Sequence, residues 1–159
     1  MARANKQESK LRSCIKMVED VIESLGHVPD AARLETGTEL PAWRVQKGSA
    51  HVYVVFVGRE QTTFIKVTAS VLNVDATVDR PRLYQHLLEL NESHILGAAF
   101  ALKGDDVILT VERSTVDLDK SEILAMVSHI EEYVGTYEAK LVAEFGGRVA
   151  GLSAVPVDL

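Results

Sequence analysis

The chain has few of the residues from which small proteins build cross-linked, metal-bound or disordered structures. Cys14 is the only cysteine among 159 residues, so an internal disulfide is impossible and a zinc site made of cysteines is excluded. With only four prolines and ten glycines, no segment has a collagenous or low-complexity composition. Because 47% of the residues are hydrophobic and 25% are charged, the composition predicts a single globular domain with its own core.

Long hydrophobic runs are also missing from the sequence. A membrane-spanning helix needs about 18 consecutive apolar residues, and a secretory signal needs an apolar central run. Neither pattern occurs in this chain. The single cysteine fits a reducing compartment, so we expect a cytoplasmic protein that does not associate with membranes.

The charge is unevenly distributed around a formal net charge of −6. Residues 1–16 carry five basic residues and one acidic residue, whereas the remainder carries twelve basic and 22 acidic residues. An acidic body repels the phosphates of nucleic acids. We therefore do not expect nucleic-acid binding, and we interpret the basic start as a solvated part of a helix.

Residues that could carry chemistry are present, but not in catalytic or metal-binding patterns. The five histidines form no HxxxH pair, and neither a GxSxG nor a GxGxxG motif occurs. Cys14 lies on the apolar side of a predicted helix, where it would be a small core residue. The paired carboxylates have structural roles available in turns, at a helix cap or on an exposed helix face. The sequence therefore predicts no catalytic residues, no metal and no cofactor, and we do not expect an enzyme.

The first half of the chain predicts one helix followed by three strands. Apolar residues at spacings of three and four from Leu11 to Leu25 predict the helix, which would stop at Gly26. Residues 27–41 contain two prolines and no periodicity, so they are predicted to be a loose surface connector. The strands are predicted around Trp43, over the doubly apolar run 51–57, and over the alternating run 65–71.

The second half predicts a helix, a hairpin and a long helix. Asp79 and Pro81 form a helix start, and a hairpin over 97–112 turns at Gly104. Asp119 and Glu122 then predict a capping box for an amphipathic helix that packs on the sheet and ends at Gly146 and Gly147. The expected fold is α+β, with elements in the order α-β-β-β-α-β-β-α and a five-stranded antiparallel sheet. Residues 1–147 would form the single domain, and 148–159 a tail that either docks along an edge strand or stays mobile.

The helix that starts after Asp79 has two apolar stripes. Leu83, Leu87 and Leu90 lie on one stripe and are predicted to face the sheet of the same domain. Tyr84 and Leu88 lie on another. The run 51–57 is likewise apolar on both faces, which leaves more apolar surface than one layer of helices needs. Either a partner protein covers this surplus, or a loop or the C-terminal tail does. The candidate interface residues are Tyr84, Leu87, Leu88, Val55 and Phe56.

Several segments resemble the type III secretion chaperone-like superfamily, which includes the YbjN family of bacterial sensory transduction regulators. The resemblance spans about residues 8–145. Three segments resemble the C-terminal half of that family: LLELN at 87–91, GAAFALKGDDVILTVE at 97–112, and the DLD start of the long helix at 117–119. YVVFV at 53–57 and FIKVTASV at 64–71 resemble the sheet of that superfamily.

The resemblance implies a small acidic α+β protein without enzymatic activity. It implies a homodimer formed through the helix that carries Tyr84 and Leu88, and binding of extended segments of client proteins. Our leading hypothesis is therefore a cytoplasmic protein-binding module, either chaperone-like or regulatory. The alternative is a regulatory domain that holds a small molecule between the sheet and the long helix, near Trp43, Phe56 and Phe64.

Overall fold

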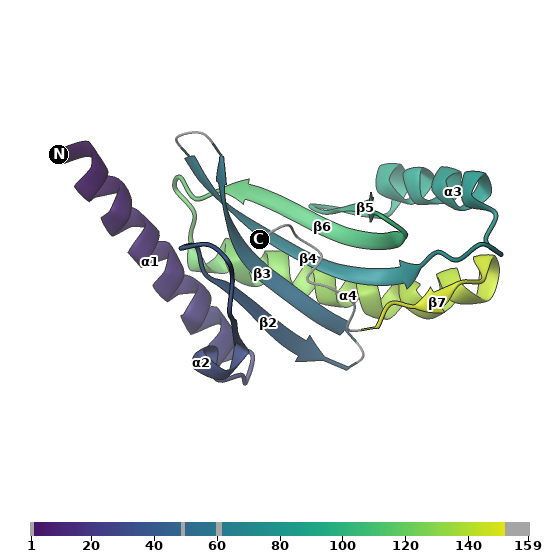
Figure 1. The fold of residues 1–159 in the computed structure, drawn as a ribbon, viewed down its shortest axis with the longest axis horizontal. Coiled ribbons are helices and arrows are strands. Elements are labelled where there is room, and N and C mark those ends of the chain that lie inside the picture. The colour runs from purple at the N-terminus through teal and green to yellow at the C-terminus, as the bar shows by residue number, and fades with distance from the viewer. Residues whose placement is uncertain (1, 49, 60–61, 152–159) are drawn as a thin grey trace.

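The computed structural model describes residues 2–48, 50–59 and 62–151, which form a sheet with helices packed along one face and at its ends (Figure 1). The elements in chain order are α1 (Ala2–Ser24), α2 (Pro29–Ala32), β1 (Arg33–Leu34), β2 (Ala42–Lys47), β3 (Ala50–Arg59), β4 (Thr62–Asn73), α3 (Arg80–Ser93), β5 (Ala99–Lys103), β6 (Asp106–Ser114), α4 (Lys120–Phe145) and β7 (Arg148–Val149).

All strand pairs in the sheet are antiparallel. The strand order is β1-β2-β3-β4-β6-β5, and β7 pairs with the end of β4. Since side chains alternate along each strand, the register divides the sheet into two faces. We call the face that packs against α4 the core face and the opposite face the outer face.

The core face is covered by α4, which lies behind the sheet in Figure 1. The helix begins with the predicted capping box, in which Asp119 accepts a hydrogen bond from the Glu122 amide and Glu122 accepts one from the Asp119 amide. Ile123 and Ile130 of α4 are fully buried in one cluster with Ile65 of β4. Burying each such side chain contributes roughly 1.5–3 kcal/mol before conformational entropy is counted. The predicted packing of this helix on the sheet is confirmed.

The predicted five-stranded sheet is wrong in its strand count and element order. The structure has seven strands, because β1 and β7 add two-residue pairings at Arg33–Leu34 and Arg148–Val149. A strand of two residues has no alternation that a sequence pattern could reveal. The other five strands follow the predicted sequence positions.

The connector predicted over 27–41 is more ordered than a loose loop. It contains the single turn α2, where Pro29 occupies the first helical position, followed directly by β1. The predicted tail also begins inside the sheet, since β7 pairs with β4 and the Ala150 amide donates to the Val71 carbonyl. Residues 152–159 of the tail lie outside the described residues.

Cys14 is buried in the core, as the helix pattern predicted. Its Sγ lies 3.8 Å from the Thr115 carbonyl oxygen, and burial raises the pKa of the thiol above its usual value. We expect the native protein not to react with a thiol reagent at about pH 8, where an exposed cysteine reacts readily. The chain unfolded in guanidinium serves as the control and should react with one equivalent. Rapid labelling of the native protein would show that α1 does not pack as described.

Candidate functional site

Helix α3 is fixed to the body of the protein at its N-terminal end. Asp79 caps the helix by accepting a hydrogen bond of 3.2 Å from the Arg82 amide. The Arg80 guanidinium donates at 2.8 Å to Asp105 in the β5–β6 turn, and this hydrogen bond raises the pKa of Arg80. Arg82 also pairs with Glu144 near the end of α4 at 3.1 Å. These contacts hold α3 beside the end of the sheet, away from α1 (Figure 1).

The C-terminal part of α3 is fixed by Asn91. Its Oδ1 accepts from the Phe100 amide at 2.7 Å, and its Nδ2 donates to the Phe100 carbonyl at 3.1 Å. The side-chain amide therefore takes the place of a neighbouring strand at the outer edge of β5. The helix continues past Asn91 and ends at Ser93.

A groove of about 200 Å³ runs between α3 and β5. Leu88 stands on one wall with 68% of its surface exposed, and Leu102 on the other with 46% exposed. The Phe100 ring is buried below and packs edge-on against Tyr137 of α4, with the ring centroids 5.6 Å apart. We call this feature the α3 groove; it is lined by Tyr84, Leu87, Leu88, Asn91, Phe100, Ala101 and Leu102.

Asn91 should contribute to stability because it satisfies two backbone groups of Phe100. We expect Asn91→Ala to lower the free energy of unfolding by about 1–3 kcal/mol, the usual cost of leaving such groups unpaired. Urea unfolding would measure the change. Gln85→Ala, which removes an exposed hydrogen bond to Glu89 on the same helix, is the control and should change stability by less than about 0.5 kcal/mol. Equal effects of the two substitutions would contradict the role of Asn91.

The outer face of the sheet carries a second apolar surface. On β3 it presents Tyr53, Val55 and Val57, and the register places Val57 opposite Phe64 of β4. Ile108 of β6 lies on the same face, because it pairs with Ser70 of β4. We call these five side chains the outer strip. Polar residues separate them on β4, as the alternating pattern of the run 65–71 indicates; they are Lys66, Thr68 and Ser70.

The structure places the five predicted interface residues in three different environments. Tyr84, Leu87 and Leu88 line the α3 groove. Val55 lies on the outer strip, packed in a small cluster with Ala42 and Tyr53. Phe56 faces the opposite way, into the core, where its ring meets the Trp43 ring edge-on at 6.0 Å.

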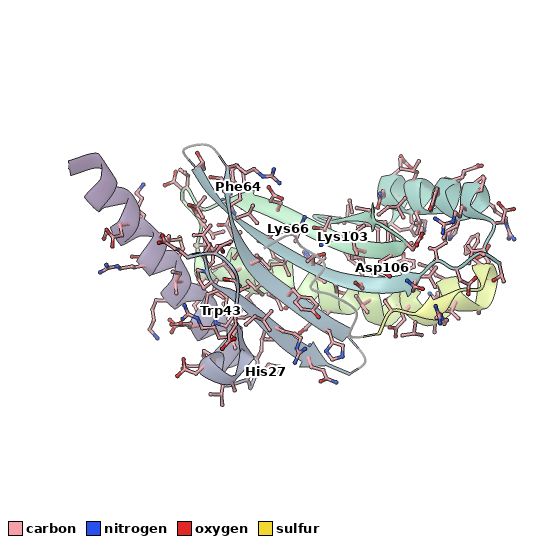
Figure 2. The ribbon with its side chains drawn as sticks, viewed as in Figure 1. His27, Trp43, Phe64, Lys66, Lys103 and Asp106 are labelled. Carbon is pink, nitrogen blue, oxygen red and sulfur yellow. The ribbon has the colours of Figure 1, made fainter. Side chains whose placement is uncertain are left out.

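Only two of the three aromatic residues suggested for a small-molecule site lie together. Trp43 and Phe56 are buried in the core, whereas Phe64 lies on the outer face toward the hairpin end of β4 (Figure 2). Within the described residues, no group of three His, Cys, Asp or Glu side chains could hold a metal ion. None of the described helices is long and apolar enough to cross a membrane.

Four residues that line the groove were not among the predicted interface residues: Asn91, Phe100, Ala101 and Leu102. Asn91 was noted only as the last residue of LLELN at 87–91, and Phe100, Ala101 and Leu102 only as part of a hairpin. Because Phe100 and Leu102 are two residues apart on a strand, the sequence does place them on the same face of β5. No local signal shows that this face meets α3, because the contact depends on where the chain returns after the helix.

Comparisons with known proteins agree with this architecture. Residues 12–151 match the family model TY-Chap1, described as T3SS (YopN, CesT) and YbjN peptide-binding chaperone 1. No curated protein sequence matches the chain. A chain in the crystal structure of the ExsC–ExsE complex is similar, with a TM-score of 0.61 and 11% identity over 80% of this chain and 92% of that chain.

A second similar chain comes from the heterodimeric ExoU–SpcU complex of the type III secretion system of Pseudomonas aeruginosa. It has a TM-score of 0.50 and 12% identity over 80% of this chain and 96% of that chain. At these identities the solved structures support the fold, and the family model supports the relationship. The resemblance proposed from the sequence is therefore confirmed: the chain belongs to the TY-Chap1 family of T3SS and YbjN peptide-binding chaperones.

Proposed function

We propose that this protein is a non-enzymatic, cytoplasmic, chaperone-like or regulatory module that forms a homodimer and binds an extended segment of a client protein. The observation that carries the proposal is the α3 groove, where Leu88 and Leu102 are exposed beside a buried aromatic floor. Exposed apolar side chains gathered on one rigid surface are typical of protein interfaces. The family description, which names peptide-binding chaperones, supports the client-binding part.

The shape of the α3 groove suits contact with a second copy of the chain. A twofold interface brings the same surface of both copies together, so each copy must offer both a ridge and a hollow. Leu88 on α3 and Leu102 on β5 are the exposed side chains on the two walls, and the groove lies between them. A twofold axis near Leu88 would insert that side chain of each copy into the groove of the other.

The outer strip suits an extended segment rather than a second globular surface. Its apolar side chains follow strand β3 and cross to Phe64 and Ile108, with polar groups between them. An extended chain presents side chains on alternate sides and offers backbone hydrogen bonds to such polar neighbours. We propose that clients lie along this strip.

Client capture tests the binding part of the proposal. The immobilised protein is incubated with cytosol from its source, and retained proteins are digested to find the protected segment. We expect Val57→Glu, on the strip, to lose a client that the wild-type protein and the exposed-site control Val28→Glu both retain. A wild-type protein that retains nothing above background would contradict client binding.

A further inference from the structure

The last described residues meet the sheet at a position where they cannot continue straight. Strand β7 pairs with β4 through Val149 opposite Leu72, and Ala150 follows opposite Val71. Strand β3 pairs with the same side of β4, with Tyr53 opposite Thr68. Extending that register places His51 opposite Ser70. The two strands therefore lie end to end along β4, and the start of β3 blocks the path of β7.

The chain must leave the plane of the sheet at Gly151. The residues around Gly151 show on which face of the sheet it does so. Ala150 and Gly151 line a small cavity of about 10 Å³ together with His51, Tyr53 and Ser70. Tyr53 and Ser70 point to the outer face, since they alternate with the core residues Val52 and Val71. Ala150 and Gly151 therefore lie next to side chains of the outer face, beside the outer strip.

Several side chains of the outer face are buried, although no described helix covers that face. Tyr53, Thr68 and Ile108 are each no more than 5% exposed. In the described part of the chain, no helix lies over this face, because α4 covers the opposite one (Figure 1). Polar side-chain atoms on this face are also buried without a hydrogen-bond partner among the described residues: His51 Nδ1, Ser70 Oγ and Thr110 Oγ1. Buried polar groups normally have partners, so an occupant with backbone donors and acceptors fits here.

We propose that the occupant is the C-terminal segment of the same chain, residues 152–159. Its sequence, LSAVPVDL, carries four large apolar side chains and a single charged one. At about 3.3 Å per residue, eight extended residues reach roughly 26 Å, whereas neighbouring strands are only about 4.8 Å apart. The segment is therefore long enough to cross β3, β4 and β6 and to cover Tyr53, Thr68 and Ile108.

If residues 152–159 occupy the outer strip, they compete there with client segments. The regulatory consequence rests on the proposed function: if clients bind the strip, they must first displace residues 152–159. A tethered segment acts at an effective concentration of the order of millimolar. Removing it should therefore raise the affinity of the strip for an extended apolar peptide by at least about tenfold.

The docking is tested first on the full chain by NMR. Methyl groups of Val157 and Leu159 are labelled, and nuclear Overhauser contacts to the Tyr53 ring are measured. Docking on the outer strip predicts contacts from at least one of these methyls. Their absence overturns the proposal, even if the protein dimerises and retains a client. Failure of dimerisation or client capture leaves these contacts unchanged, so the two proposals fail separately.

Peptide binding provides the second test. The probe is the synthetic peptide LSAVPVDL, and the control is a scrambled peptide of the same composition. We expect the probe to bind a chain shortened to end at Gly151 at least about tenfold more tightly than it binds the full chain. Equal binding to both chains, or equal binding of the scrambled peptide, overturns the proposal. If the shortened chain does not fold, the NMR contacts in the full chain decide.

Discussion

Replacing Leu88 with aspartate is expected to convert the protein from a dimer to a monomer. Leu88 is the most exposed residue of the α3 groove, and burying it against a second copy would contribute about 1.5–3 kcal/mol. Leu88→Asp removes that contribution and places an unpaired carboxylate in the interface, which costs more. The dissociation constant of the dimer should rise at least about a hundredfold, measured by sedimentation equilibrium.

The matched control for this substitution is Val28→Asp. Val28 is 67% exposed, close to the 68% of Leu88, but it precedes α2, far from α3 (Figure 1). The control should leave the dimer intact. Because Leu88 is exposed within one chain, its replacement should also leave the unfolding of the monomer nearly unchanged. A Leu88→Asp variant that dimerises as tightly as the wild-type protein would place the interface elsewhere.

Gly147→Ala is expected to destabilise the protein strongly. Gly147 has a φ of +78°, and a Cβ added there would lie 2.7 Å from the Asn73 carbonyl oxygen and 3.1 Å from Leu72 Cδ1. The left-handed backbone costs a residue with a side chain about 1–2 kcal/mol, and the contact with backbone adds about 1–3 kcal/mol of overpacking. We expect a loss of about 2–5 kcal/mol in urea unfolding.

The neighbouring Gly146 separates the two sources of the stability loss, which are backbone strain and the close contact of the added Cβ. Gly146 has a similar φ of +81°, but its nearest added contact is Thr77 Oγ1 at 3.9 Å. Gly146→Ala should therefore cost only the backbone term, about 1–3 kcal/mol for its φ of 81° and ψ of −153°. The difference between the two variants measures how tightly the chain passes β4 on its way into β7. If both variants lose the same stability, the close approach at Gly147 is not rigid.

The parts of the fold that the sequence predicted are those with a repeated local pattern. The spacing of three and four between Ile123 and Leu141 predicted a helix buried along one side, and these residues are buried in α4. The alternation from Ile65 to Val71 predicted a strand with one apolar face, which became the core side of β4. Each pattern repeats because one side of the element faces the core, so the signal lies within the element itself.

The remaining features depend on contacts between distant segments. Asn91 gives no sign in the sequence that it will bond to Phe100, because the partner is fixed only when β5 returns beside α3. Phe56 and Val55 are adjacent in an apolar run, and only the register decides which of them faces the core. Strands β1 and β7 are stabilised by their neighbours rather than by their own composition.

The solution mass of the unmodified chain is the most direct test of the proposed homodimer. Sedimentation equilibrium at on the order of 50 μM, well above a micromolar dissociation constant, measures it without labels. The α3 groove predicts a species of twice the single-chain mass of 17.4 kDa. A single species of 17.4 kDa at that concentration would contradict self-association through the groove.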